Sequence, residues 1–324
     1  MTDPTPPQWE RAVLERVALK ALEEQRRARQ WSALFKLLFF ILAFTIVAGW
    51  LGWIGRGEKE ATVATGGRHT AVVDLDGVIA PEGKASAENV IRGLDRAFKD
   101  PGTKGVVLQI NSPGGSPVQA GYIYDEIRRL RAKYPKIPLY AVVEDLCASG
   151  GYYVAAAADR IYVDKASLVG SIGVIISSFG FTGAMEKLGI ERRAYIAGEN
   201  KDFLDPFAPE NPEQRAHAQK MLEEIHQQFI KAVRDGRAGK LKETPDMFSG
   251  LIWTGERSIQ LGLADAIGNT PYVAREVIKA EKIVDYTPEE TVFDVLSKRF
   301  GTSFGTALGR STAESLLRGA GGVR

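Results

Sequence analysis

The residues that could do chemistry in this 324-residue chain begin with a serine that precedes two glycines. Ser149 follows an apolar segment and stands at the start of an expected helix, before Gly150 and Gly151. The hydroxyl could be a nucleophile, because the glycines leave room for a substrate backbone and the Gly150 N–H could stabilise an oxyanion. The serine could instead only cap the helix. Cys147 is an alternative nucleophile, although a small apolar residue at a strand end is the simpler interpretation.

A second glycine-rich segment, INSPGGS at 110–116, lies between an expected strand and an expected helix. Successive glycines allow close approach of the backbone, so their N–H groups could point at a developing oxyanion. An ordinary strand–helix turn is the other interpretation. The segment is not a Walker nucleotide-binding loop, because no Gly-Lys-Ser/Thr follows at the required spacing.

A nucleophilic serine needs a base, and the chain has only three histidines. His69 precedes the first expected strand, while His217 and His226 are nine positions apart on an expected polar helix, so a Ser-His-Asp triad is hard to build. Lysine is the other option. An unperturbed lysine has a pKa near 10.4, which leaves about one amine in two thousand neutral at pH 7, and burial can lower that pKa by several units. Composition and spacing do not choose among the lysines.

The composition is that of an ordinary globular protein, with 44% apolar and 25% charged residues. A net charge of +2 gives no reason to expect a nucleic-acid surface. The single cysteine excludes an intrachain disulfide and a multi-cysteine zinc site.

Short apolar segments alternate with helical patterns over much of the chain, which predicts an α/β fold with a mainly parallel sheet covered by helices. We expect strands at 70–75, 105–110, 139–143, 160–163, 171–176 and 192–196. We expect helices at 85–98, 118–134, 150–158, 211–238, 245–250, 255–262 and 271–281.

The longest apolar run, residues 37–54, has eighteen residues without a charge. As a helix it spans roughly 27 Å, close to the hydrocarbon core of a bilayer, which predicts an uncleaved transmembrane anchor rather than a buried core helix. Five Lys or Arg residues lie in the twenty positions before the run and three in the twenty after it. This bias favours a cytoplasmic N-terminus, with the rest of the chain across the membrane.

Four motifs follow one another in a specific order: INSPGGS at 110–116, CASGGYY at 147–153, VGSIGVI at 169–175 and AGENKD at 197–202. In this order they resemble the signal peptide peptidase A family of membrane-bound Ser/Lys proteases, peptidase family S49, in its short single-repeat form. The resemblance covers residues 70 to about 270 and implies the fold shared by Clp protease and crotonases.

The resemblance also implies roles for individual residues and for a neighbouring subunit. Subunits of this family form a ring, and a single-repeat protomer is thought to receive its lysine from a neighbour. The residues that match by position are the nucleophile Ser149, the general base Lys201 and the lysine-orienting Ser171. We expect Gly115 and Gly150 to be the oxyanion donors, with Gly114 as the alternative to Gly115.

Together these expectations describe a membrane-anchored serine endopeptidase of the bacterial inner membrane, with a periplasmic catalytic domain and no metal or cofactor. The resemblance implies that its substrates are cleaved signal peptides and other unfolded membrane-proximal peptides. The alternatives are a crotonase-like acyl-CoA enzyme and a catalytically inactive peptide-binding membrane scaffold. The expected segments are a cytoplasmic N-terminal segment (1–36), an anchor (37–54), a linker (55–69), a protease domain with a helical C-terminal part (70–285) and a tail (286–324).

Overall fold

The computed structural model describes residues 20, 25–27, 29–45 and 67–288. The chain divides into two compact units, residues 1–65 and residues 66–324. Residues 46–54 of the expected anchor, 55–66 of the expected linker and 289–324 of the expected tail lie outside the described residues.

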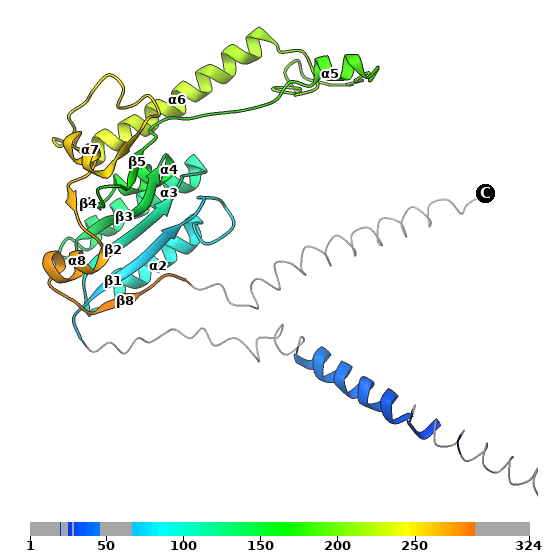
Figure 1. The fold of residues 1–324 in the computed structure, drawn as a ribbon, viewed down its shortest axis with the longest axis horizontal. Coiled ribbons are helices and arrows are strands. Elements are labelled where there is room, and N and C mark those ends of the chain that lie inside the picture. Colours follow the sequence, from blue (N-terminus) through cyan, green and yellow to red (C-terminus); the bar gives the residue numbers. More distant parts are fainter. Residues whose placement is uncertain (1–19, 21–24, 28, 46–66, 289–324) are drawn as a thin grey trace, which may run out of the picture. The chain divides into compact units, whose positions relative to one another are not determined.

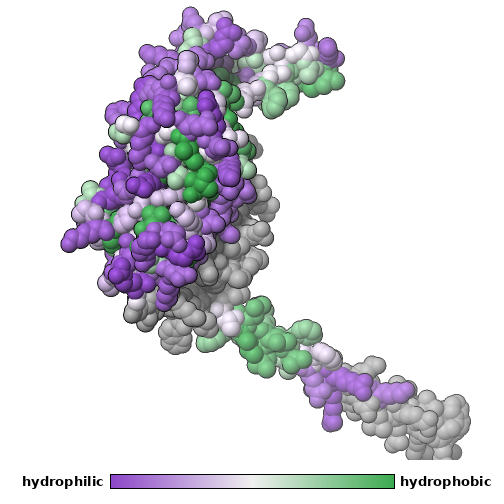
Figure 2. Space-filling view, turned by 60° about the vertical axis from the view of Figure 1, so that its left-hand side comes forward, coloured by the Kyte–Doolittle hydropathy of each residue, from purple (hydrophilic) through white to green (hydrophobic). Residues whose placement is uncertain are grey.

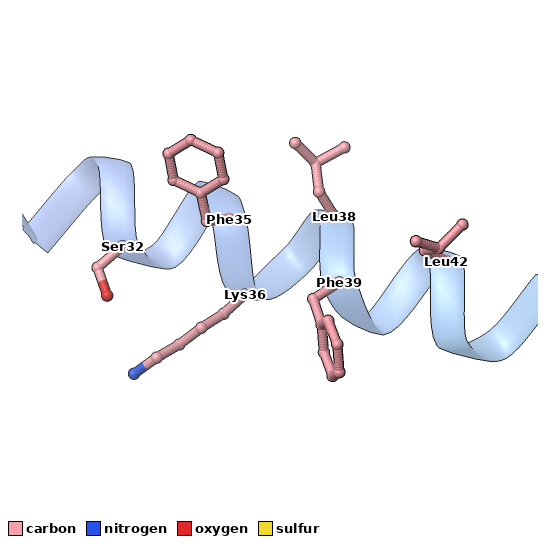
Figure 3. Close-up of a pocket in the computed structure, with 6 residues that line it drawn as sticks. All are labelled: Ser32, Phe35, Lys36, Leu38, Phe39 and Leu42. Atoms are coloured by element: carbon pink, nitrogen blue, oxygen red, sulfur yellow. The ribbon is translucent and has the colours of Figure 1, made fainter. Parts of the chain in front are cut away.

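In the described part of the first unit, the helix Gln25–Thr45 is long and apolar enough to cross a membrane. Its apolar side chains are exposed, as an anchor's would be before it meets lipid. Figure 3 shows side chains projecting from this helix, among them Phe35, Lys36 and Phe39. Among the described residues, only this helix lines the hollow between them, which is not the lining of an enclosed binding cavity.

The second unit is built on one sheet (Figure 1). Its described strands are β1 (His69–Asp76), β2 (Thr103–Ser112), β3 (Leu139–Ala148), β4 (Arg160–Val163), β5 (Leu168–Gly170), β6 (Ile252–Thr254), β7 (Ala266–Ile267) and β8 (Ile283–Asp285). The helices are α2 (Ala87–Lys99), α3 (Pro117–Lys133), α4 (Gly150–Ala155), α5 (Thr182–Lys187), α6 (Pro212–Gly236), α7 (Gly255–Gln260) and α8 (Thr270–Tyr272), which continues into the π-helix η1 (Val273–Ile278).

The sheet order is β6-β5-β3-β2-β1-β8, with β4 beside β3 and β7 beside β4. Every pair is parallel except β5 with β6. β3 divides its length between two partners: Tyr140–Val142 pair with β4, and Leu146–Ala148 pair with β5. This division places the carboxyl end of β3 directly beside β5, and the mainly parallel sheet confirms the expected α/β class.

Helices cover the sheet because its strands are apolar on both faces. α2, α3 and α4 pack together on one face, and Val73 of β1 lies against Gly93 of α2. On the other face, η1 contributes Val273 and Ile278 to a buried cluster with Val107 of β2. In open α/β sheets, ligands bind at the carboxyl ends of the strands, where the loops emerge. We therefore expect the functional site at that edge of the sheet.

Residues 172–211, here called the arm, leave the sheet after β5 and carry α5. Figure 1 shows α5 near the end of α6 that is remote from the sheet. The strands expected at 171–176 and 192–196 are wrong, because neither segment is a strand in the structure. An apolar segment becomes a strand only beside a partner, and here Tyr195 is 94% exposed.

Most other expected elements are confirmed within a few residues. The helix expected at 245–250 is wrong, since the segment forms turns. The part after residue 211 is helical as expected, but it also contains β6, β7 and β8, which the helical pattern did not indicate. These strands have only two or three residues, too few for a period-2 pattern to register.

Candidate functional site

Ser149 lies between β3 and α4 with a strained backbone. Its φ of 50° and ψ of −122° lie in a region that side chains with a Cβ rarely adopt. Among the described residues only four besides glycine have positive φ, and Ser171 is another of them. Such outliers concentrate at active sites. The Ser149 side chain makes no capping hydrogen bond, so helix capping does not explain this serine.

The strain predicts that Ser149→Gly unfolds at a higher temperature than Ser149→Ala. Both changes remove the hydroxyl, but glycine adopts a positive φ without the Cβ penalty of about 1 kcal/mol. That difference corresponds to roughly 2–4 °C in a domain of this size. Thermal unfolding of the two variants measures it, and equal midpoints would show that position 149 is not strained.

The turn Gly114–Gly115 packs directly against Ser149. A Cβ added to Gly114 would lie 2.6 Å from the Gly150 nitrogen and 2.8 Å from the Ser149 Cβ. A Cβ added to Gly150 would lie 3.3 Å from the Gly115 nitrogen. The N–H groups of Gly115 and Gly150 are therefore neighbours beside the Ser149 side chain.

The hydrogen bonds distinguish the two glycines of this turn. The Gly114 N–H donates to the Ser112 Oγ at 3.2 Å. Within the described part of the chain, neither the Gly115 N–H nor the Gly150 N–H donates to a backbone carbonyl in a turn, loop or cap. These two N–H groups are therefore the pair available to a substrate oxygen.

Ser171 reaches the same place from β5. Ala148 pairs with Gly170 in the sheet, and the Ser149 N–H donates to the Gly170 carbonyl at 2.8 Å. Ser171 therefore stands next to Ser149, and its φ is also 50°. Three neighbouring strands, β2, β3 and β5, thus deliver the glycine turn and the two serines to one edge of the sheet.

Lys201 lies elsewhere in the chain. It is exposed in the arm, between Asn200 and Asp202, whose side chains accept hydrogen bonds from Gln214 in the first turn of α6. The other half of α6 lies near the start of the arm, where the His226 ring contacts the Ile172 carbonyl at 3.1 Å. Gln214 and His226 are twelve positions apart on the helix, roughly 18 Å along the axis. A lysine side chain cannot span that distance, so one chain does not bring Lys201 to Ser149.

The three histidines have other partners. His69 is buried and contacts the hydroxyls of Tyr286 and Thr103 at 3.1 and 3.2 Å. The ring of His217 packs edge-on against Phe203, and His226 engages the Ile172 backbone. Among the described residues no histidine hydrogen-bonds Ser149.

Cys147 is buried in β3, where it pairs with Ser112 of β2. Burial raises the pKa of its thiol far above the ordinary value, which disfavours the reactive thiolate. This supports Ser149 over Cys147 as the nucleophile. No group of three or more His, Cys, Asp or Glu residues that could hold a metal occurs among residues 20, 25–27, 29–45 and 67–288.

The sequence did not indicate two supports of the glycine turn. The segment Gly77–Ile79 runs beside it, with the Ile79 N–H donating to the Gly114 carbonyl at 2.8 Å and the Ser116 N–H donating to the Ile79 carbonyl at 2.8 Å. Ser112 supplies the second support through its hydroxyl. Gly77–Ile79 carries no motif, and Ser112 differs from other serines only by its place inside INSPGGS.

Comparison with known proteins gives a consistent answer. Residues 131–284 match peptidase family S49. A putative protease of Methanocaldococcus jannaschii is 34% identical over 270 residues, which cover 78% of this chain and 86% of that protein. A putative signal peptide peptidase SppA of Enterococcus faecium is 31% identical over 238 residues, covering 70% of this chain and 69% of that protein.

A Brucella melitensis protein named as the Na⁺/H⁺ antiporter NhaA is 49% identical over 176 residues, which are 54% of this chain. The chain spans only 24% of that protein's length, and the same share of its Brucella abortus counterpart. The name describes those much longer proteins.

A mainly parallel α/β sheet presents Ser149 beside a glycine turn, an arrangement that a serine hydrolase can use. The chain belongs to peptidase family S49, a family of serine peptidases, as the order of its motifs indicated.

Proposed function

We propose that this protein is a membrane-anchored serine endopeptidase that uses Ser149 and Lys201 as a catalytic dyad. One observation carries the proposal: Ser149, in a strained conformation, lies beside the neighbouring backbone nitrogens of Gly115 and Gly150. Nucleophilic attack on a peptide carbonyl needs this combination of a hydroxyl and convergent donors.

In the proposed reaction, neutral Lys201 accepts the Ser149 hydroxyl proton as the Oγ attacks the substrate carbonyl carbon. The Gly115 and Gly150 N–H groups stabilise the oxyanion, and Ser171 orients the lysine amine. The amine proton then passes to the leaving nitrogen, which leaves an acyl-enzyme on Ser149. Water, activated by the same amine, releases the second product.

We infer that Lys201 acts in the active site of a neighbouring copy, within a homo-oligomeric ring. In one chain, Lys201 lies far from the start of the arm at Ile172, and this separation supports the arrangement. The arm also exposes large apolar side chains, including Ile175 (82%), Phe179 (78%) and Leu188 (73%). Figure 2 shows apolar side chains on the arm's surface. Burial against a second copy would remove them from water and dry the amine.

The substrates in this proposal are cleaved signal peptides and other unfolded peptides near the membrane. They would bind in extended form through backbone hydrogen bonds and apolar pockets. The N-terminal apolar helix would anchor the chain in the bacterial inner membrane, with the catalytic domain in the periplasm. Such an anchor would hold the site where these peptides emerge.

The proposal is tested by incubating the purified full-length protein with an apolar peptide and, separately, with a fluorophosphonate. Peptide cleavage and a label mapped by mass spectrometry to Ser149 are expected, both absent in Ser149→Ala. Ser167→Ala, which removes the hydroxyl of the serine just before β5, is the matched control and should keep cleavage and label. An unlabelled wild-type protein that binds CoA would favour the acyl-CoA alternative. A protein that binds the peptide without cleaving it would be the inactive scaffold.

A further inference from the structure

Ser112 lies at the end of β2, fully buried, with its hydroxyl between two backbone segments. The Oγ donates to the Gly77 carbonyl at 2.6 Å and accepts from the Gly114 N–H at 3.2 Å. A Cβ added to Gly151 of α4 would lie 3.3 Å from the Ser112 Cβ. One side chain therefore touches the glycine turn, the segment that supports it and the helix that follows Ser149.

The direction of the Gly115 N–H follows from the bonds around it. In a trans peptide group the N–H points opposite to the preceding carbonyl. The Gly114 carbonyl accepts from the Ile79 N–H at 2.8 Å, so the Gly115 N–H points away from Ile79. The Gly115 nitrogen lies on the side of Gly150, where the oxyanion would form.

Ser112 holds both the glycine turn and the Gly77–Ile79 segment beside it through two hydrogen bonds. Its bond from the Gly114 N–H holds the peptide group just before the one that carries the Gly115 N–H. Its bond to the Gly77 carbonyl holds the segment whose Ile79 anchors the turn. The Ser112 side chain is buried, so loss of its hydroxyl would take the partner from the buried Gly114 N–H and from the partly buried Gly77 carbonyl, and the turn would shift to satisfy them.

We propose that Ser112 is a positioning residue for oxyanion stabilisation: its hydroxyl locks the Gly114–Gly115 turn so that the Gly115 N–H faces the carbonyl attacked by Ser149. This inference rests on the proposed function. Ser112 touches no reacting atom and acts through the backbone of the turn.

The test compares Ser112→Ala with wild type in peptide hydrolysis and in the binding of two inhibitors of one sequence, a peptide aldehyde and the corresponding alcohol. The Ser149 Oγ adds to the aldehyde carbon and its proton passes to the base, so the adduct places an oxyanion in the site, whereas the alcohol does not. We expect kcat to fall about ten- to a hundredfold with KM nearly unchanged, because misplacing a donor costs less than removing it.

The aldehyde should bind more weakly by the same factor as the loss of kcat/KM, and the alcohol should bind within about twofold of wild type. Ser86→Ala is the matched control, since it removes a buried hydroxyl that caps α2 by accepting from the Asn89 N–H. It should keep wild-type kcat and aldehyde affinity. Ser112→Cys, which fills the same place with a weak hydrogen-bonding group, should lose less kcat than Ser112→Ala.

Equal losses of aldehyde and alcohol affinity would overturn the inference, as would wild-type kcat in Ser112→Ala while Ser149→Ala is inactive. Either result would leave the proposed peptidase standing. If Ser112→Ala does not fold, Ser112→Cys decides between the same outcomes. A wild-type protein that neither hydrolyses the peptide nor binds the aldehyde would instead reject the proposed function together with the inference.

Discussion

Co-assembled Ser149→Ala and Lys201→Ala chains are expected to hydrolyse an apolar peptide, although each variant alone is inactive. If the dyad forms between neighbouring copies, a site needs an intact Ser149 from one copy and an intact Lys201 from the next. A Lys201→Ala chain beside a Ser149→Ala chain supplies both. If the dyad formed within one chain, no site in the mixture would contain both groups.

The expected recovery follows from counting neighbours. In a ring assembled at random from equal amounts of the two variants, about one site in four has the productive pair, because each interface in a closed ring is of the same head-to-tail kind. The activity per chain should therefore approach about a quarter of the wild-type value. Co-expression with two different affinity tags and sequential purification isolates the mixed complex for the hydrolysis assay.

Two controls distinguish sites shared between copies from sites formed within one chain. When equal amounts of wild type and the Ser149→Ala/Lys201→Ala double variant are co-assembled, about a quarter of all sites in the ring should be productive if sites are shared, and about half if each site lies within one chain. Lys187→Ala, which changes another exposed lysine of the arm, should keep full activity alone. A mixed complex with only background activity would contradict the shared dyad.

Regular hydrophobic patterns in the sequence predicted most of the helices and strands of the fold. The helices α2, α3 and α6 and the strands β1, β2 and β4 repeat apolar residues at a period that local sequence reveals. The segment 192–196 has the same β-forming composition but no neighbouring strand, and composition does not report on neighbours. The short strands β6, β7 and β8 exist because the sheet offers them an edge, which is a tertiary cause.

The site followed a similar rule. Motif order singled out Ser149, Ser171 and the glycine turn, and the structure brings these together at the ends of three strands. The position of Lys201 relative to Ser149 depends on how the arm projects, and nothing in AGENKD encodes that. The sequence did not indicate Ser112 either. The place of its hydroxyl depends on hydrogen bonds to Gly77 and Gly114, which lie in different segments of the chain.

Gly115→Ala is expected to reduce kcat by roughly 10²–10³-fold, the usual effect of losing one oxyanion donor. The φ of Gly115 is 148°, and an added Cβ would lie 2.1 Å from the Ile79 carbonyl oxygen. Backbone atoms cannot yield as a flexible side chain would, so the turn must move away from Ile79. That movement carries the Gly115 N–H out of line with Gly150, whereas Ser149 and Lys201 are unchanged.

Gly121→Ala is the matched control for this change. Gly121 lies in α3, and an added Cβ would meet nothing within 4 Å. This variant should keep wild-type kcat and gain up to about 1 kcal/mol of stability, because alanine favours a helix over glycine. Initial rates and thermal unfolding of both variants make the comparison. Gly115 is exposed on its turn, so Gly115→Ala should still fold. A folded Gly115→Ala protein with wild-type kcat would show that the Gly115 N–H does not face the oxyanion.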